Sequence, residues 1–225
     1  MMNNPSGCLD RHTRRRLRTR TDLLRAALRL FGERHPEDVA VQDITRVADV
    51  GNGSFYNHFD DKAAIYEAVI RELVEGWDAW LWQAVGNEAD PALRLSHWIR
   101  GNLERGQRDP DYAAFISSNG LRLIETHGAS GSLPREIDRG LGTGRFVVAD
   151  PQMVKRAAAG VVLATQAALS GRRNEVMASS RAAWYVLTLL GIAREEADRL
   201  VSLPFPAGEP DDYGLVERHH LRHAV

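Results

Sequence analysis

The sequence predicts an all-helical protein, and two observations support this prediction. From Leu23 to about Ile192, apolar residues recur three and four positions apart, which places them on one face of successive helices. No segment has the character of a strand. With 225 residues, 44% of them hydrophobic, the chain is long enough for one large core or two smaller ones.

The N-terminal segment is predicted to be a flexible basic arm over residues 1–17, because the residues up to about Arg16 show no helical periodicity. Thr21-Asp22 indicates the start of the first helix, which Pro36 ends. Six arginines in and just after the arm have no acidic residue among them: Arg11, Arg14, Arg15, Arg16, Arg18 and Arg20. Such a run is either a solvated tail or a contact with the phosphates or the minor groove of a nucleic acid.

Two short helices at an angle are predicted within residues 41–62. Ile44 belongs to an apolar stripe on the first, a small turn follows at 49–51, and Phe55 and Phe59 share the inward face of the second. The opposite face of the second helix carries small or hydrogen-bonding residues and no acid: Gly53, Ser54, Asn57 and His58. This pattern suits a helix that enters the major groove of DNA, although an ordinary helical hairpin would present a similar face to water.

Further helices follow toward the C-terminus. Asp60-Asp61 are expected to cap a long fourth helix. The other segments with helical periodicity are a fifth from Pro91 to the break at 106–110, a sixth over 112–124 that is interrupted near Gly120, a seventh beginning over 133–139, an eighth over 151–169, a ninth over 175–192 and a short one over 195–201. A flexible tail is expected over residues 208–225.

Composition excludes some classes of protein. The net charge is −1, so any nucleic-acid binding must come from local charge asymmetry such as the arginine run. Cys8 is the only cysteine, which rules out an intrachain disulfide and fits a cytoplasmic location. The N-terminus lacks the apolar segment of a signal peptide, and the longest near-apolar run, 157–169, is shorter than the ~20 residues that cross a bilayer. No membrane partner is expected.

The sequence gives little support to catalysis, metal binding or a cofactor. His97, Glu104, Glu125 and His127 have no recognisable spacing, and no phosphate-binding loop, nucleophile motif or metalloprotease motif is present, so we expect no enzyme and no cofactor. His219, His220 and His223 have helical spacing that would suit a metal. They lie in a segment without a cysteine, so a flexible tail is the favoured interpretation and no metal site is predicted.

Seven residues in one window carry a resemblance to a known family. The segment Gly53-Ser-Phe-Tyr-Asn-His-Phe-Asp-Asp-Lys62 resembles the TetR family of bacterial transcriptional regulators, in which Gly, Ser or Thr, an aliphatic or aromatic residue, Tyr, His, Phe and Lys stand at these spacings. The resemblance implies an N-terminal three-helix DNA-binding domain with a helix-turn-helix over 18–64. It also implies a C-terminal helical ligand-binding and dimerisation domain over 65–207. Two positions depart from the family: Ala40 replaces a capping Thr, and Asp49 replaces a Gly in the turn.

The resemblance and the polar face together predict the DNA contacts. Asn52, Ser54 and Asn57 are expected to meet base edges, and Gly53 to allow close approach of the backbone. Phe55 is given a mixed role, packing inward or stacking on a thymine methyl. The residues expected to contact phosphates are Arg18 and Arg20 near the arm, Gln42, Thr45 and Arg46 on the outer side of the second helix, and Tyr56, His58 and Lys62, which match the family's phosphate contacts.

The C-terminal helices are predicted to hold an effector pocket and a dimer interface. The expected pocket residues are aromatic or polar residues on apolar faces, which would otherwise be ordinary core residues: Trp80, Trp98, Asn102, Phe115, Asn119 and Gln166. The eighth and ninth helices are expected to form a four-helix bundle with a second copy, unless they form a hairpin of the chain's own core. The residues assigned to that interface are Met153, Ala157, Gly160, Val161, Ala164, Ala183, Trp184, Leu187 and Leu190.

These features predict a sequence-specific, DNA-binding transcriptional regulator. The expected form is a homodimeric repressor that a small, mainly apolar effector releases from a palindromic DNA operator. Two alternatives remain: a helical DNA-binding protein whose own tryptophans fill the pocket, and a helical enzyme of unknown type. A ligand-dependent thermal shift would separate the first from the expected form, and turnover would be needed to support the second.

Overall fold

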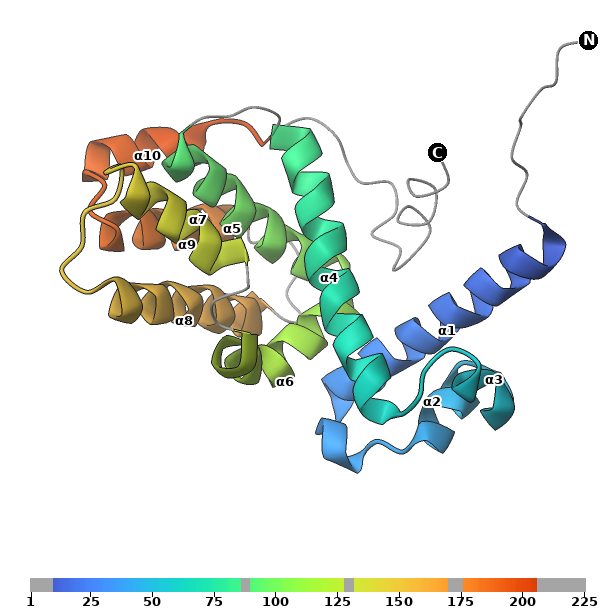
Figure 1. Cartoon of the computed structure of the whole chain (residues 1–225). Coiled ribbons are helices and arrows are strands. Elements are labelled where there is room, and N and C mark those ends of the chain that lie inside the picture. Colours follow the sequence, from blue (N-terminus) through green and yellow to red (C-terminus); the bar gives the residue numbers. More distant parts are fainter. Residues whose placement is uncertain (1–9, 86–89, 128–131, 170–175, 206–225) are drawn as a thin grey trace, which may run out of the picture.

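The computed structural model describes residues 10–85, 90–127, 132–169 and 176–205, and all regular elements in these ranges are helices (Figure 1). The elements are α1 (Arg11–Glu33), a 3-10 turn η1 (Pro36–Asp38), α2 (Val41–Val47), α3 (Asn52–Tyr56), α4 (Lys62–Val85), α5 (Pro91–Arg108), α6 (Pro110–His127), α7 (Ser132–Gly142), α8 (Pro151–Leu169), α9 (Val176–Leu189) and α10 (Arg194–Ser202). The prediction of an all-helical fold is therefore confirmed. In the described part of the chain, no helix is long and apolar enough to cross a membrane.

The structure has two lobes, which we call the head and the body. The head contains α1, α2, α3 and the first half of α4, around a core in which Phe31, Ile44 and Phe55 are completely buried. α6 contributes Tyr112 and Phe115 to this same core. The body contains α5 and α7–α10, with α8 and α9 side by side on the opposite side of the molecule from α1 (Figure 1). α6 is thus shared between the lobes.

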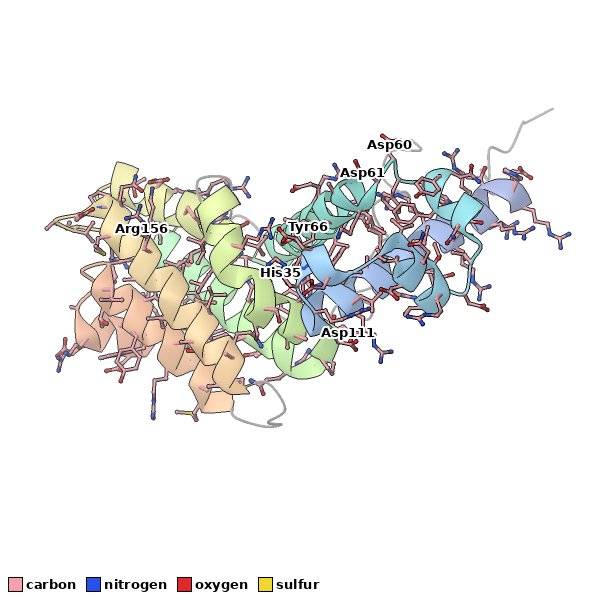
Figure 2. The ribbon with its side chains drawn as sticks, turned by 90° about the horizontal axis from the view of Figure 1, so that it is seen from below. His35, Asp60, Asp61, Tyr66, Asp111 and Arg156 are labelled. Carbon is pink, nitrogen blue, oxygen red and sulfur yellow. The ribbon has the colours of Figure 1, made fainter. Side chains whose placement is uncertain are left out.

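The junction between the lobes closes the C-terminal end of α1. The carbonyls of Phe31 and Gly32 lie in the last turn of α1, where they have no partner within the helix. They accept hydrogen bonds from the Asn119 amide and the Ser118 hydroxyl of α6, both at 2.8 Å. The Tyr66 hydroxyl of α4 donates to the Asn119 oxygen at 3.1 Å, and Figure 2 shows Tyr66 between head and body. α6 therefore acts as the cap of α1.

The body forms around α5. One side of α5 supplies Leu95, Ile99 and Leu103 to an apolar cluster with α8, α9 and α10. Another side buries the Arg94 guanidinium, which donates to both carboxylate oxygens of Glu136 on α7 at 3.0 and 3.2 Å. This ion pair fixes α7 against α5. Because both charges are buried, removing either partner would leave the other charge buried without a partner and would destabilise the contact.

Two of the expected helix boundaries are wrong. α1 begins at Arg11, ten residues before Thr21, so the part of the expected arm from Arg11 onward is helical; residues 1–9 lie outside the described residues. Arginine is a good helix former, and no glycine or proline interrupts the run, so the helix continues beyond the core. α6 is also continuous through Gly120, where an interruption was expected. Glycine at this position permits a close contact with α8, because an added side chain would collide with Leu163. His219, His220 and His223, for which a metal site was considered but not predicted, lie outside the described residues.

Candidate nucleic-acid interface

The helix-turn-helix consists of α2, a turn at 48–51 and α3. Asp49 has φ +53°, the left-handed conformation that the turn requires and that aspartate tolerates better than most residues. The Val50 amide donates to the Thr45 carbonyl at 3.0 Å. Thr45 is only 3% exposed, and its hydroxyl donates to the Asn52 amide oxygen at 2.7 Å, which fixes α2 to α3. The prediction that Thr45 lies on the outer side of α2 is therefore wrong.

The N-terminus of α2 lacks a side-chain cap because Ala40 occupies that position. Asp43 compensates in part, since its carboxylate accepts a hydrogen bond from the Ala40 amide at 3.2 Å. That backbone hydrogen bond, with smaller contributions from Arg34 and Arg46, lowers the pKa of Asp43, although desolvation opposes the shift. The Arg46 guanidinium donates to Asp43 at 2.6 Å on the exposed surface, so this expected phosphate contact is internally paired in the free protein.

The outer face of α3 presents the polar residues that the sequence predicted. Asn52, Gly53, Tyr56 and Asn57 are exposed, and Ser54 is half-buried. A side-chain carbon added at Gly53 would meet no atom of the protein within 4 Å, so packing within the chain does not require glycine at this position. If glycine is needed there, the reason is the close approach of another molecule to the backbone.

The inner face of α3 is anchored in the core of the head. Phe55 is completely buried, with its ring centroid 5.3 Å from Tyr56 in an edge-to-face arrangement and 5.8 Å from Phe59. The mixed role expected for Phe55 is therefore wrong in its outward part, because its side chain is not available to a thymine methyl.

Two further residues from the expected DNA-contacting set, Lys62 and Arg20, have structural partners in the head. The Lys62 ammonium donates to the Glu37 carbonyl at 2.9 Å, which holds η1 beside the start of α4. Asp61 caps α4 by accepting from the Ala64 amide at 2.7 Å. The Arg20 guanidinium is paired with Glu72 of α4 and lies over the Phe59 ring, 5.2 Å from its centroid. The guanidinium of Arg20, expected to contact a phosphate, is thus held within the head in the free protein.

A groove of about 650 Å³ runs between the first turns of α1 and the helix-turn-helix. Its lining residues are His12, Arg15, Arg16 and Thr19 of α1, Asp49, Val50 and Gly51 of the turn, and Ser54, Asn57 and His58. Asp49 carries the only carboxylate among these lining residues. Sequence reasoning assigned the α1 contacts to Arg18 and Arg20, but Arg15 and Arg16 line the groove. The spacing of 12, 15, 16 and 19 at i, i+3, i+4 and i+7 was the available signal.

His58 connects the groove to the core of the head. Its side chain is half-buried, and burial lowers its pKa, with further lowering by the charges of Arg16 and Arg20. This shift favours the neutral form of His58 in the free protein, and an anion bound nearby would favour its protonation.

The residues expected to line an effector pocket do not form one group. Phe115 and Asn119 belong to the head core and the junction, so their assignment to a pocket in the body is wrong. The buried Asn102 donates to the Trp98 carbonyl at 2.8 Å and accepts from the Tyr112 hydroxyl at 2.8 Å. Trp98 is half-buried against the body core, while the Trp80 side chain lies outside the described residues.

Gln166 is 2% exposed and packs directly on Gly106 of α5. A side chain at position 106 would fall 2.1 Å from the Gln166 amide nitrogen, so glycine is what lets α8 approach α5 here. The amide is thus a packed group at the α5–α8 contact of the body.

The expected dimer residues separate into two faces. On α8, Met153, Gly160 and Ala164 are exposed, and Ala157 and Val161 are half-buried. On α9, the side chains assigned to the interface are completely buried in the chain's own core, with only Trp184 half-buried: Ala183, Leu187 and Leu190. Those three assignments are wrong, because the more apolar face of α9 packs against α5. The outer face of α9 carries other large apolar residues, namely Met177, Tyr185 and Leu189, at 69%, 51% and 45% exposure.

Comparison with known proteins places both lobes in one family. Residues 23–69 match the family described as bacterial regulatory proteins, tetR family, and residues 90–203 match the tetracyclin repressor-like C-terminal domain, which alone covers half of the chain. Among solved structures, RolR in complex with its ligand resorcinol is 25% identical, with a TM-score of 0.62, over 86% of this chain and 98% of that chain. RolR without ligand is 26% identical, with a TM-score of 0.59, over 82% and 97%.

Curated relatives match over a shorter region. The transcriptional repressor DhaR of Mycobacterium sp. (strain GP1) is 34% identical over 86 residues, which are 38% of this chain and 43% of the relative. The regulator HbdR of Aromatoleum sp. (strain CIB) is 27% identical over 105 residues, 46% of each chain, so the matches span less than half of these relatives. They are named as regulators, which agrees with the expectation of a non-enzyme. The fold, the helix-turn-helix and the two matched domains together identify the chain as a member of the TetR family of DNA-binding bacterial transcriptional regulators.

Proposed function

We propose that this regulator is a homodimeric, cytoplasmic repressor, which leaves a palindromic operator when a small, mainly apolar effector binds the body. The observation that carries the DNA-reading part is the exposed face of α3, in which Ser54 and Asn57 line a groove whose other wall is cationic. Amides and hydroxyls on a helix can read base edges, while the cations neutralise phosphates.

The proposed DNA contacts follow from the exposure of the side chains. Asn52, Ser54 and Asn57 read bases, Gly53 allows the close approach of the duplex, and Gln42, Tyr56 and His58 contact phosphates. Lys62 and Arg46 can join them by exchanging their present partners, the Glu37 carbonyl and Asp43, for phosphates. Thr45 and Phe55 act indirectly, by holding α3 in position.

The proposed dimer uses the outer faces of α8 and α9. Ala157, Gly160 and Ala164 form a stripe of small residues that permits close approach of helices, with Met153 at one end. Met177, Tyr185 and Leu189 supply apolar area on α9. Two such pairs would build a four-helix bundle and hold two heads about 34 Å apart, the spacing of successive major grooves.

The effector is proposed by analogy with RolR, which is solved with resorcinol and matches this chain over most of its length. Among the residues expected to line the pocket, Trp98 has the side chain that suits a mainly apolar ligand with one polar group. Its indole N–H is shielded from water and has no hydrogen-bond partner among the described residues.

One observation favours a second candidate, a DNA-binding protein without an effector. The Asn102 amide, which was expected to bind the effector, already has protein partners for both its nitrogen and its oxygen, so it is occupied within the chain itself. Thermal unfolding with a panel of small phenols, resorcinol included, separates the two: a phenol that raises Tm and weakens operator binding supports the repressor. Absence of any shift across such a panel favours the second candidate.

The experiment that tests DNA reading is fluorescence anisotropy with a duplex selected by the protein from random sequence, against a scrambled duplex of equal length. A specific regulator binds the selected duplex about 10³-fold or more tightly. Asn57→Ala should reduce this ratio, because one base contact is worth about 1–3 kcal/mol of discrimination. Equal binding to both duplexes by the wild type would contradict the proposal.

A further inference from the structure

The first turns of α1 extend beyond the core of the head (Figure 1), and their side chains line one groove together with Ser54 of α3. Residues 11–16 are all exposed, so hydrophobic burial does not explain why this helix continues. The cations on it are not distributed evenly with respect to the groove. Arg15 and Arg16 line the groove, whereas Arg14 and Arg18 are exposed elsewhere on the same turns.

The extension is anchored rigidly at its base. Leu23 and Leu24 are completely buried in the head core. One turn earlier, the Arg20 guanidinium is paired with Glu72 and covers the Phe59 ring. The Thr21 hydroxyl donates to the Leu17 carbonyl at 3.0 Å within the helix. A ligand that binds the exposed turns therefore meets a preformed helix, and little backbone entropy is lost on binding.

The groove has the charge pattern of an anion site that faces a polar reading surface. One wall has Arg15, Arg16 and His12, and the opposite wall has the neutral Ser54 and Asn57 together with one carboxylate, that of Asp49 in the turn. A chain with evenly spaced negative charges, lying along the first wall, would bring its neighbouring bases to the second. The sugar–phosphate backbone of DNA has this repeat, with one charge per 3.4 Å along each strand.

We propose that this groove seats the backbone of the operator strand that borders the major groove entered by α3, with Arg15 and Arg16 bonded to its phosphates. α1 is then a rigid backbone clamp, which fixes the register in which α3 meets the bases. This inference rests on the proposed operator binding, and it adds an element outside the helix-turn-helix to the DNA-contacting surface. The contact carries no base information, so it strengthens binding to every sequence alike.

The test compares two double variants with equal loss of charge on the same helix. Arg15→Gln/Arg16→Gln removes the clamp, and Arg14→Gln/Arg18→Gln is the matched control; glutamine keeps the helix propensity of arginine. Anisotropy is measured on the selected and scrambled duplexes from 50 to 200 mM salt. Each phosphate contact contributes about 0.9 to the slope of log K against log salt, so the clamp variant should lose about 1.8 for each bound head. When salt rises from 50 to 200 mM, the loss of affinity of this variant should therefore be smaller than that of the wild type by a factor of about ten per head.

The outcomes separate the clamp from the proposed function. The expected result is a flatter slope for the Arg15/Arg16 variant on both duplexes, an unchanged ratio between the duplexes, and less than half this effect for the control. Equal effects of the two variants, with helix content unchanged by circular dichroism, would overturn the clamp and leave operator binding standing. A wild type without preference for the selected duplex would overturn operator binding, and the clamp with it.

Discussion

Replacing Asn119 by alanine should destabilise the protein strongly, although Asn119 belongs neither to the groove nor to the proposed dimer surface. The substitution removes the donor to the Phe31 carbonyl and the acceptor of the Tyr66 hydroxyl. Asn119 is 2% exposed, so water does not replace the lost cap of α1 without rearrangement. A buried unsatisfied group costs roughly 1–3 kcal/mol. The half-buried Tyr66 can turn toward water, which places its share at about 1 kcal/mol and the total at about 3 kcal/mol.

Urea denaturation followed by circular dichroism at one fixed protein concentration measures this free energy of unfolding. Tyr66→Phe should cost about 1 kcal/mol in the wild type and almost nothing in the Asn119→Ala background, because the partner is already absent. The exposed Asn57→Ala is the control and should change stability by less than about 0.5 kcal/mol. A cost below about 1 kcal/mol for Asn119→Ala would refute the capping of α1 by α6, and additive effects of the two changes would refute the hydrogen bond between Tyr66 and Asn119.

Three further predictions use other positions. Asp49→Gly should stabilise the protein by about 1 kcal/mol in urea denaturation, because glycine adopts the positive φ without strain, and should tighten DNA binding by removing the groove's carboxylate; unchanged affinity would contradict the second part. Gly32→Ala should cost about 1–3 kcal/mol, because its added carbon would lie 2.9 Å from the Phe115 amide, whereas Gly53→Ala should keep stability and lose operator affinity. Operator affinity should rise as pH falls, because bound phosphates raise the pKa of His58, which is lowered in the free protein. At pH values between these two pKa values, His58 takes up a proton when DNA binds, so binding tightens as pH falls through this range. His58→Gln should flatten this dependence more than His12→Gln does, and a reversed order would exclude His58 as its source.

The sequence predicted those parts of the structure that local spacing determines. Phe55 and Phe59, four residues apart, face inward. Asp49, which stands where the family has a glycine, adopts the left-handed conformation of the turn. The errors concern partners distant in the chain. Arg20 pairs with Glu72, and Asn119 caps α1, across 52 and 88 residues, and neither pairing leaves a periodic signal.

The sequence also does not show which face of a helix packs against the chain's own core and which meets a second copy. Helical spacing identifies an apolar face on α9, but not whether α5 or a second copy covers it, so Leu187 was assigned to the wrong contact. The start of α1 was missed for a related reason. Its extension is a helix without a hydrophobic face, and it depends on the propensity of arginine and on anchors further along the chain.

The contribution of α6 to the head has a consequence for how such regulators can be recombined. A fragment that ends with α4 would lack Tyr112 and Phe115, which fill the core of the head, and would leave the end of α1 uncapped. Fusing this head to the body of another family member would therefore join α1 to a foreign α6. The unit that can be exchanged between relatives is the head together with the matching surface of α6. A chimaera joined after α4 would have a cavity in the core of the head where Tyr112 and Phe115 normally pack.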